Sequence, residues 1–515
     1  MTSTRPGAAW VVAALLVAAA AAASEPAPAA GAAGLAEQAA SALVAVFAVT
    51  RHGARNVLPK SSTLKESEAT GGPTLLPQGA AQCAAAGRAF RARYLAAGSC
   101  GAAGTCLPPE RGAEAYGVLG GPGVGFHNYN TFAASSSLDR TLKSAAAFWA
   151  GAFPAAAGNA SQPALSVPVY TDGADVDDWR VRGYTKCPSY ARRLESWLGS
   201  AEFRAKEEDT ASLRAAVQAL APQLNTSLAN WWNVYDAFNV WRTFGVGDAQ
   251  PAMDDATFNQ TVELAMWLET RKMRPALAGS LLGGALLADL LSRLQAAAAA
   301  AGGGGGSYYR LLGVSAHYNT QLGLLAALQQ GGAAPLGAPY PWEARIPALA
   351  AVLAFELHAL PRGAGFAVRA VAQDGPARDY VALALPCAEA GGAAEAALGA
   401  GACSLDAFAR LAGPQAFSAA GDWCAACDND DVLACRLSRA ERLLAEAPGP
   451  GGGAGGGGAG ARRGGAVAPG MVALWCVVAV ALAAALAGGA LLVARRARAS
   501  RERRWAAETV ASGLA

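Results

Sequence analysis

The sequence predicts an α/β fold in which a mostly helical segment interrupts a domain of strands and helices. Two observations support this class: an apolar, β-rich run at residues 43–50, and a helical pattern over residues 190–294 with apolar residues three and four apart. Strand-like segments then return at residues 308–314, 349–360 and 366–372. We therefore expect one α/β domain, residues 36–189 and 307–446, with a helical cap inserted at residues 190–306.

The elements of the first half follow in order from the local pattern. Residues 80–94 have the composition of a helix, and residues 165–170 form a short β-branched run between turn residues. Ser137 or Asp139 can cap a helix that begins beside Arg140, and helix N-termini attract anions. This helix start is therefore a candidate anion site, although an ordinary surface arginine would give the same pattern.

The second half contains a connector and a strand pair. Residues 296–306 are alanine followed by glycine and lack the lysine and hydroxyl residue of a phosphate loop, so we interpret them as a flexible connector. A turn near residues 362–363 separates two further strands.

Both ends of the chain carry apolar segments. Residues 1–23 resemble a cleaved secretory signal peptide, and residues 471–493 are long enough to cross a bilayer. Six arginines follow that second segment, which places the tail, residues 494–515, in the cytosol. Residues 447–470 are glycine-rich and read as a stalk. We expect a single-pass type I membrane protein of the secretory pathway, at the cell surface or in endomembranes, with its ectodomain extracellular or lumenal.

Composition agrees with that compartment. The net charge of +3 gives no global support for a nucleic-acid partner. Nine cysteines precede residue 471, so we expect disulfides and at least one thiol that is free or pairs between chains. Cys424 and Cys427 have the spacing of a metal site, but the secretory context favours disulfides. Sequons begin at Asn159, Asn225 and Asn259 and predict a glycoprotein.

The run Arg51-His52-Gly53-Ala54-Arg55 carries the strongest chemical signal. It follows a strand, where ligands bind in open α/β sheets. Two guanidiniums suit phosphate oxygens, and nearby positive charge keeps an imidazole neutral and nucleophilic. An ordinary loop histidine is the alternative. His317 also follows a strand, so it and His52 are expected to share one crevice.

Together these segments resemble the histidine acid phosphatases, the branch of the histidine phosphatase superfamily that includes prostatic and lysosomal acid phosphatases. The ordered resemblance runs from about residue 43 to residue 427 and includes residues 51–55, 75–79, 91–94, 136–145, 167–171, 186–188, 315–317, 385–387 and 403–408. It implies a phosphoglycerate-mutase-like α/β sandwich and phosphate monoesters as substrates.

The resemblance also implies residue roles. His52 would be the nucleophile, Arg51, Arg55 and Arg140 would bind the phosphate oxygens, and His317 would contribute a further donor. Neither a metal nor a cofactor is implied. The sequence leaves a homodimer open.

The chain departs from the family at one position, where Tyr318 replaces the aspartate that protonates the leaving group. Tyrosine titrates near pH ~10 and suits that role poorly. Asp139 and Glu356 are candidate substitutes, and good leaving groups such as aryl phosphates would need none. We therefore predict an atypical acid phosphatase, with a catalytically impaired, phosphoester-binding membrane ectodomain as the alternative.

Other features are open to more than one interpretation. Aromatic residues at helical spacing over residues 231–244 are typical of core packing, and a pocket lining is the minority interpretation. An inositol-phosphate specialist remains an option within enzymes, although the cap has mixed charges instead of an excess of basic residues. An adhesion protein would leave the ordered motifs unexplained.

Overall fold

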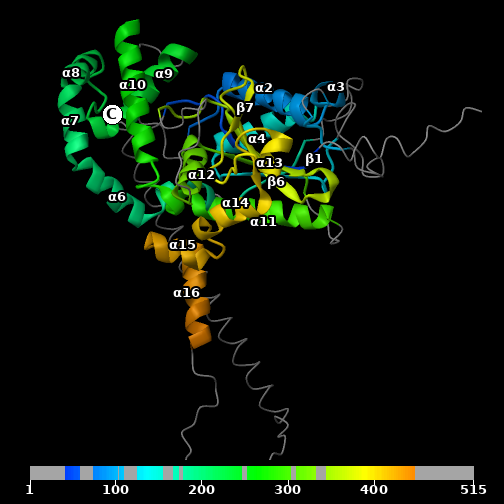
Figure 1. The fold of residues 1–515 in the computed structure, drawn as a ribbon. Helices are drawn as coiled ribbons and strands as arrows, with labels where there is room; N and C mark the ends of the chain where they lie inside the picture. The colour runs from blue at the N-terminus through cyan, green and yellow to red at the C-terminus, as the bar shows by residue number, and fades with distance from the viewer. Residues whose placement is uncertain are drawn as a thin grey trace, which may run out of the picture. The chain divides into compact units, whose positions relative to one another are not determined.

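The computed structural model describes residues 41–57, 73–101, 104–108, 125–154, 166–172, 178–245, 252–302, 309–331 and 344–446. Within them, an eight-stranded sheet is surrounded by helices (Figure 1). The strands are β1 (Ala42–Arg51), β2 (Thr131–Ser135), β3 (Val169–Tyr170), β4 (Leu311–Ala316), β5 (Val352–Ala359), β6 (Phe366–Gln373), β7 (Tyr380–Leu383) and β8 (Cys403–Ser404).

The helices of the described residues connect and cover these strands. They are α2 (Pro77–Tyr94), α3 (Ala97–Cys100), α4 (Asp139–Ala152), α5 (Trp179–Arg182), α6 (Pro188–Leu198), α7 (Ala201–Asp209), α8 (Ala211–Leu220), α9 (Trp231–Phe244), α10 (Asp255–Lys272), α11 (Gly279–Ala301), α12 (Tyr318–Gly331), α13 (Ala393–Leu398), α14 (Leu405–Ala412), α15 (Ala420–Cys427) and α16 (Leu433–Glu446). Short 3₁₀ helices occur at Gly183–Thr185, Leu228–Asn230, Pro361–Gly363 and Gly413–Gln415.

Strand β1 lies in the middle of the sheet, whose order is β3-β2-β4-β1-β5-β6-β7, with β8 beside β6. It runs parallel to β4 and antiparallel to β5. Its side chains alternate, so that Val46 and Ala48 join one buried cluster and Phe47 and Val49 join the other. Because both faces are buried, the strand is continuously apolar, and the predicted α/β class is confirmed.

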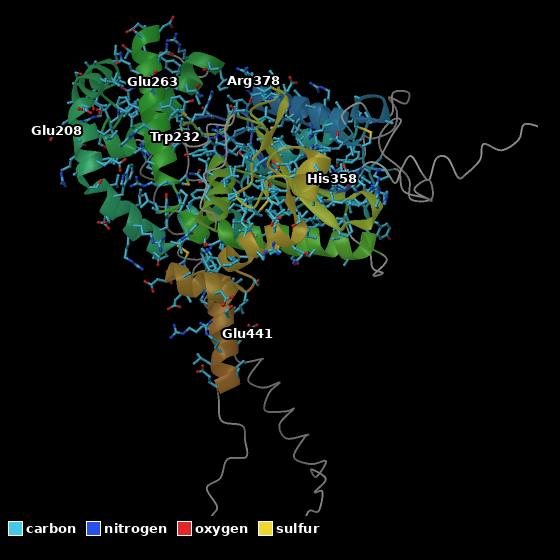
Figure 2. The ribbon with its side chains drawn as sticks, in the orientation of Figure 1. Glu208, Trp232, Glu263, His358, Arg378 and Glu441 are labelled. Atoms are coloured by element: carbon cyan, nitrogen blue, oxygen red, sulfur yellow. A yellow bond between two sulfur atoms is a disulfide. The ribbon has the colours of Figure 1, made fainter. Side chains whose placement is uncertain are left out.

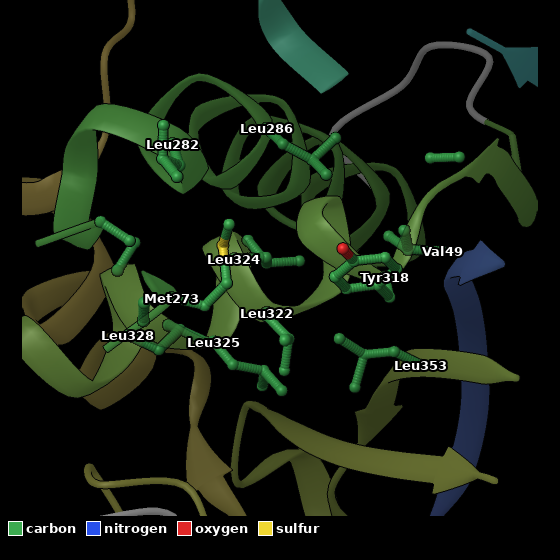
Figure 3. Packing of buried hydrophobic residues seen from close by; sticks show 14 of the residues in the cluster. Val49, Met273, Leu282, Leu286, Tyr318, Leu322, Leu324, Leu325, Leu328 and Leu353 are labelled. Atoms are coloured by element: carbon green, nitrogen blue, oxygen red, sulfur yellow. The ribbon is translucent and has the colours of Figure 1, made fainter. Parts of the chain in front are cut away.

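Helices cover the sheet on both faces. Residues of α2 and α4, including Phe90 and Trp149, fill the first cluster. On the opposite face, α11, α12 and α14 contribute to the second cluster. Figure 3 shows Tyr318 and Leu322 of α12 in that cluster, together with Val49 of β1 and Leu353 of β5. The result is a three-layer arrangement with the sheet in the middle.

One prediction about the connector was wrong. Residues 296–301 form the last turns of α11 instead of a flexible segment, and Ala297 and Ala298 are buried. Alanine has the highest helix propensity, so an alanine run that can pack extends a helix. The glycines at 303–306 lie outside the described residues.

Helix α11 is also long and apolar enough to cross a membrane by length and composition. It is mostly buried, however, and packs against α12 and β1, as a core helix does. The segments predicted as signal peptide (1–23), stalk (447–470), membrane span (471–493) and tail (494–515) lie outside the described residues, as does the sequon at residue 159. The chain divides into two units, 1–446 and 447–515, and every described residue belongs to the first.

Helices α6 to α10 form the inserted helical part, seen to one side of the sheet in Figure 1. Helix α10 packs against α9 and α8, whereas α11 returns to the sheet. Most of the aromatic residues of α9 are core, as predicted: Trp231 and Phe238 are buried. Trp232, Tyr235 and Phe244 nevertheless line a cavity.

Four disulfides account for eight cysteines, and Cys83 is a buried free thiol. The Cys-x-x-Cys pair belongs to two bonds, Cys424–Cys435 and Cys187–Cys427. The other two bonds are Cys100–Cys106 and Cys387–Cys403. The preference for disulfides over a metal site is therefore confirmed.

We expect the double variant Cys187→Ser/Cys427→Ser to lose roughly 2–5 kcal/mol of unfolding free energy, because this bond closes a loop of 240 residues. The Cys100→Ser/Cys106→Ser variant is the matched control. Its bond spans only 6 residues, so it restricts the unfolded chain less. Denaturant unfolding of both variants measures the difference. Equal losses would contradict the loop-length argument.

Candidate active site

The site forms where three neighbouring parallel strands end. Ser135 of β2 is paired with Ser315 of β4, and Ala316 of β4 is paired with Arg51 of β1. The residues that follow these strands therefore meet at one edge of the sheet. The imidazole rings of His52 and His317 lie there with their centroids 5.4 Å apart.

The loop after β1 is held tightly against α2. A Cβ atom on Gly53 would lie 2.1 Å from the carbonyl oxygen of Gly79, so only glycine allows this approach. The amide of Gly53 donates to the hydroxyl of Ser144 (3.1 Å), and the amide of Ala54 donates to Gln82 Oε1 (2.9 Å). These bonds fix the backbone that carries His52.

The hydrogen bonding of His52 leaves one ring nitrogen available. Its Nδ1 lies 2.8 Å from the carbonyl oxygen of Gly53. A carbonyl can only accept, so Nδ1 carries the hydrogen and donates it. The lone pair of the neutral ring is therefore on Nε2, as a nucleophile requires.

The surroundings of both histidines favour the neutral form of the imidazole. Burial, and then the positive charge of Arg140, lowers the pKa of each imidazole well below its usual value. Further positive charge comes from Arg51 and Arg55 for both rings, and from Arg182 for His317. The arginines around His52 thus lower its pKa, as expected for an imidazole close to positive charges.

The three predicted arginines reach the site from different elements. Arg55 makes a bidentate ion pair with Asp236 of α9 at 2.8 and 2.9 Å. Arg51 donates to the carbonyl of Pro347, and its guanidinium lies 5.1 Å from the ring centre of Tyr318. The buried Nε–H groups of Arg51, Arg55 and Arg140 bond to no other described residue, so this site is short of acceptors.

Arg140 occupies the first turn of α4, as predicted, but the helix cap differs from the expectation. The N-cap residue is Leu138, and no side chain caps the helix. Ser137 bonds instead to Asp178 through both its amide (2.7 Å) and its hydroxyl (2.8 Å). The orphan amides of the first turn therefore remain without a side-chain cap beside Arg140.

Two neighbouring cavities meet at this edge. The first, of about 490 Å³, is lined by His52, Arg55, Arg140, His317 and Tyr318, among others. The second, of about 920 Å³, extends between the cap and the loop after β6. Figure 2 labels Trp232 and Arg378, which line this second cavity from the two sides. Arg51 lines the second cavity and not the first, whereas Arg55 and Trp232 line both.

Several residues of the site were not anticipated from the sequence. Asp236 and Glu269 come from the cap, and Arg182 and Lys272 add positive charge to the first cavity. Ser136 shares a 3.1 Å hydrogen bond with Nε2 of His317. Of these residues, only Asp236 could have been singled out from the sequence. It is a lone carboxylate among the aromatic residues of α9, and a buried carboxylate needs a partner.

The two carboxylates proposed to replace the missing acid lie elsewhere. Asp139 is about half exposed and faces Lys143. Glu356, in β5, is buried among Arg93, Arg369 and His358. Neither lines the cavity that holds His52. Among the described residues, no cluster of three or more His, Cys, Asp or Glu side chains could hold a metal ion.

We expect Arg140→Gln to raise the pKa of both histidines, because Arg140 is the neighbouring positive charge that lowers it most. The neutral imidazole reacts with diethyl pyrocarbonate, so the pH midpoint of His52 modification should move upward in the variant. Stabilisation of the folded chain by inorganic phosphate should also fall; it reaches ~2.7 kcal/mol at 100 times Kd. Unchanged values of both quantities would place Arg140 outside the site.

Comparison with known proteins gives the family. The model of the histidine phosphatase superfamily (branch 2) matches residues 61–372, which include Arg140, His317 and Tyr318 but begin after the His52 loop. None of the curated protein sequences compared with the chain matches it significantly.

The solved structures that the chain is similar to include phytases and an inositol phosphatase. They include a Citrobacter braakii phytase (15% identity, TM-score 0.49, 73% of this chain and 98% of that one) and a Hafnia alvei phytase in complex with tartrate (15%, 0.48, 74% and 98%). A third is a Bifidobacterium longum multiple inositol polyphosphate phosphatase in complex with inositol hexasulfate (15%, 0.41, 69% and 89%). Because the family model matches more than half of its length, the chain belongs to branch 2 of the histidine phosphatase superfamily.

Proposed function

We propose that this chain is an acid phosphatase that hydrolyses phosphate monoesters through a phosphohistidine at His52. Membership of the family supports phosphatase activity in general. The observation that carries the finer proposal is the state of His52: its Nδ1–H is bound to Gly53, and its free Nε2 belongs to a ring that stays neutral among arginines.

The proposed reaction has two steps. Nε2 of His52 attacks phosphorus while the ester P–O bond breaks, and water then breaks the N–P bond and releases phosphate. Phosphoryl transfer mainly requires in-line placement and neutralisation of the three equatorial oxygens. Arg55 and Arg140 line the same cavity as His52 and are suited to that task, as is His317, whose ring centre lies 5.4 Å from that of His52.

The lowered pKa of His52 also fits work in acid. An ordinary histidine is largely protonated below pH ~6.5 and loses its nucleophilic lone pair. Burial and neighbouring arginines keep His52 neutral further into the acidic range. Together with the apolar segment at residues 471–493, this favours a membrane-anchored enzyme whose catalytic domain faces an acidic lumen or the cell exterior.

The test is to supply radiolabelled phosphate monoester to the full chain in detergent, quench it with alkali, and map the label. Phosphohistidine survives alkali, so label on the peptide that contains His52, together with release of inorganic phosphate, supports the proposal. Phosphate binding without label or turnover would instead support a phosphoester-binding ectodomain.

A further inference from the structure

Tyr318, which replaces the aspartate of the family, has defined partners for both its ring and its hydroxyl. Its ring lies 5.1 Å from the guanidinium of Arg51 and 5.0 Å from the ring of Trp232. Its hydroxyl donates to Oε2 of Glu269 at 2.7 Å. Burial, and then the charge of Glu269, raises the pKa of Tyr318 well above its usual value. The tyrosine therefore holds its proton and acts as a hydrogen-bond donor.

Glu269 is a buried carboxylate in the cavity that holds His52. It lies on α10 and lines this first cavity together with His317. Among the described residues that line this cavity it is the one carboxylate. Its second oxygen, Oε1, accepts from Nζ of Lys272 at 2.7 Å, so both oxygens have fixed partners.

We propose that Glu269, positioned by Tyr318, is the group that protonates the leaving-group oxygen. This inference rests on the proposed phosphohistidine mechanism. The cap thereby supplies from α10 the carboxyl group that relatives of this family carry beside the distal histidine.

The proton balance closes over one cycle. As Nε2 of His52 bonds to phosphorus and the ester P–O bond breaks, the protonated carboxyl of Glu269 gives its proton to the departing oxygen, and the alcohol leaves. In the second step a water molecule attacks phosphorus, the N–P bond breaks, and the water proton returns to Glu269. Tyr318 and Lys272 stabilise the carboxylate that exists between the two steps.

Other groups near this position suit the role less well. Asp236 lines the second cavity and not the cavity that holds His52. The groups that face Glu269 are Lys272 on its own helix, Tyr318 on α12 and Tyr190 on α6. Burial, and then the charge of Glu269, raises the pKa of Tyr190.

The leaving group provides the test. Para-nitrophenolate departs without help, whereas an alkoxide requires a proton. The constant to compare is kcat/KM, which covers the steps up to departure of the alcohol and not the hydrolysis of the phosphohistidine that all substrates share. In the full chain, Glu269→Gln should lower kcat/KM for ethyl phosphate by about 10²–10⁴-fold. Its kcat/KM for para-nitrophenyl phosphate should fall by less than about 10-fold. Tyr318→Phe keeps the ring against Arg51 but removes the hydroxyl, and should give a smaller loss with the same preference for the better leaving group.

Asp236→Asn is the matched control, because it removes a nearby buried carboxylate that binds Arg55. Its loss should be similar for both substrates. Labelling of His52 by para-nitrophenyl phosphate in Glu269→Gln checks that the variant is folded. Equal losses of kcat/KM on both substrates in Glu269→Gln, or an unchanged kcat/KM for ethyl phosphate, would overturn the role of Glu269 alone. Absence of a phosphohistidine in the wild-type chain would overturn the proposed function and this inference together.

Discussion

Substitution of His52 by alanine is expected to lower kcat for para-nitrophenyl phosphate by at least about 10⁴-fold, the scale typical of losing a nucleophile. The variant has no Nε2 to accept the phosphoryl group, and no other described imidazole shares the position beside Gly53. His317 is not a replacement, because its Nε2 is bound to Ser136. Initial rates with substrate in excess, corrected for a mock preparation, measure the loss.

The same variant should still bind phosphate. Arg55 and Arg140 remain around the cavity, and their buried Nε–H groups have no acceptor among the described residues. Thermal stabilisation by inorganic phosphate should therefore survive His52→Ala while turnover disappears. Retention of kcat within about 10-fold would rule out His52 as the nucleophile, even in an active phosphatase. If His52→Ala loses both phosphate binding and folding, the same measurements should be made on His52→Gln.

The sequence alone could place a site residue where that residue directly follows a predicted strand. His52 and His317 each come directly after a strand, and parallel pairing of β1 with β4 brings them side by side. Arg140 entered the site only through the family resemblance, because the sequence pattern predicted no strand at Thr131–Ser135 and an ordinary surface arginine fitted the helix start. Local pattern and the rule for parallel sheets are enough for the two histidines.

Residues of the cap could not be placed in this way. Glu269 lies in a helix of mixed charge, where nothing in the spacing separates it from solvated neighbours such as Glu263. Its position depends on how α10 packs against α9 and on the hydrogen bond of Glu269 to Tyr318 of α12, 49 residues further along the chain. The alanine run at 296–301 was misjudged for a related reason, since composition alone does not reveal that α11 has a surface to pack on.

The cap and the sheet are joined by polar contacts at the site itself. Asp236 of α9 binds Arg55, and Glu269 of α10 binds Tyr318. Both contacts are buried, so each charged group depends on its partner across the interface. The cap therefore does more than enclose the cavity: it provides a partner for Arg55, which is proposed to bind phosphate, and it carries the proposed proton donor.

Glu356 illustrates the opposite case, a buried carboxylate whose surroundings indicate structure and not catalysis. Its Oε1 accepts from Arg93 Nη2 (2.7 Å) and the hydroxyl of Tyr94 (2.7 Å), and its Oε2 accepts from Arg369 (2.7 Å) and His358 (3.3 Å). Burial opposes its ionisation, but the His358 bond and the two guanidiniums outweigh burial and hold the pKa of Glu356 well below its usual range. It is therefore an ion that joins α2, β5 and β6.

Glu356→Gln is expected to cost about 3–5 kcal/mol of unfolding free energy at neutral pH, because two mostly buried arginines lose their counter-charge. A carboxyl whose folded pKa is depressed adds stability that is complete above its unfolded pKa, near 4.3, and is lost as pH falls below it. The difference between wild type and variant should thus be constant near pH 7 and shrink in acid. Denaturant unfolding at pH 7 and at pH 3.5 measures it, with Glu389→Gln, from an exposed pair, expected to change stability by less than about 0.5 kcal/mol. If Glu356→Gln instead kept its stability and lost kcat selectively on alkyl phosphates, Glu356 and not Glu269 would be the leaving-group acid.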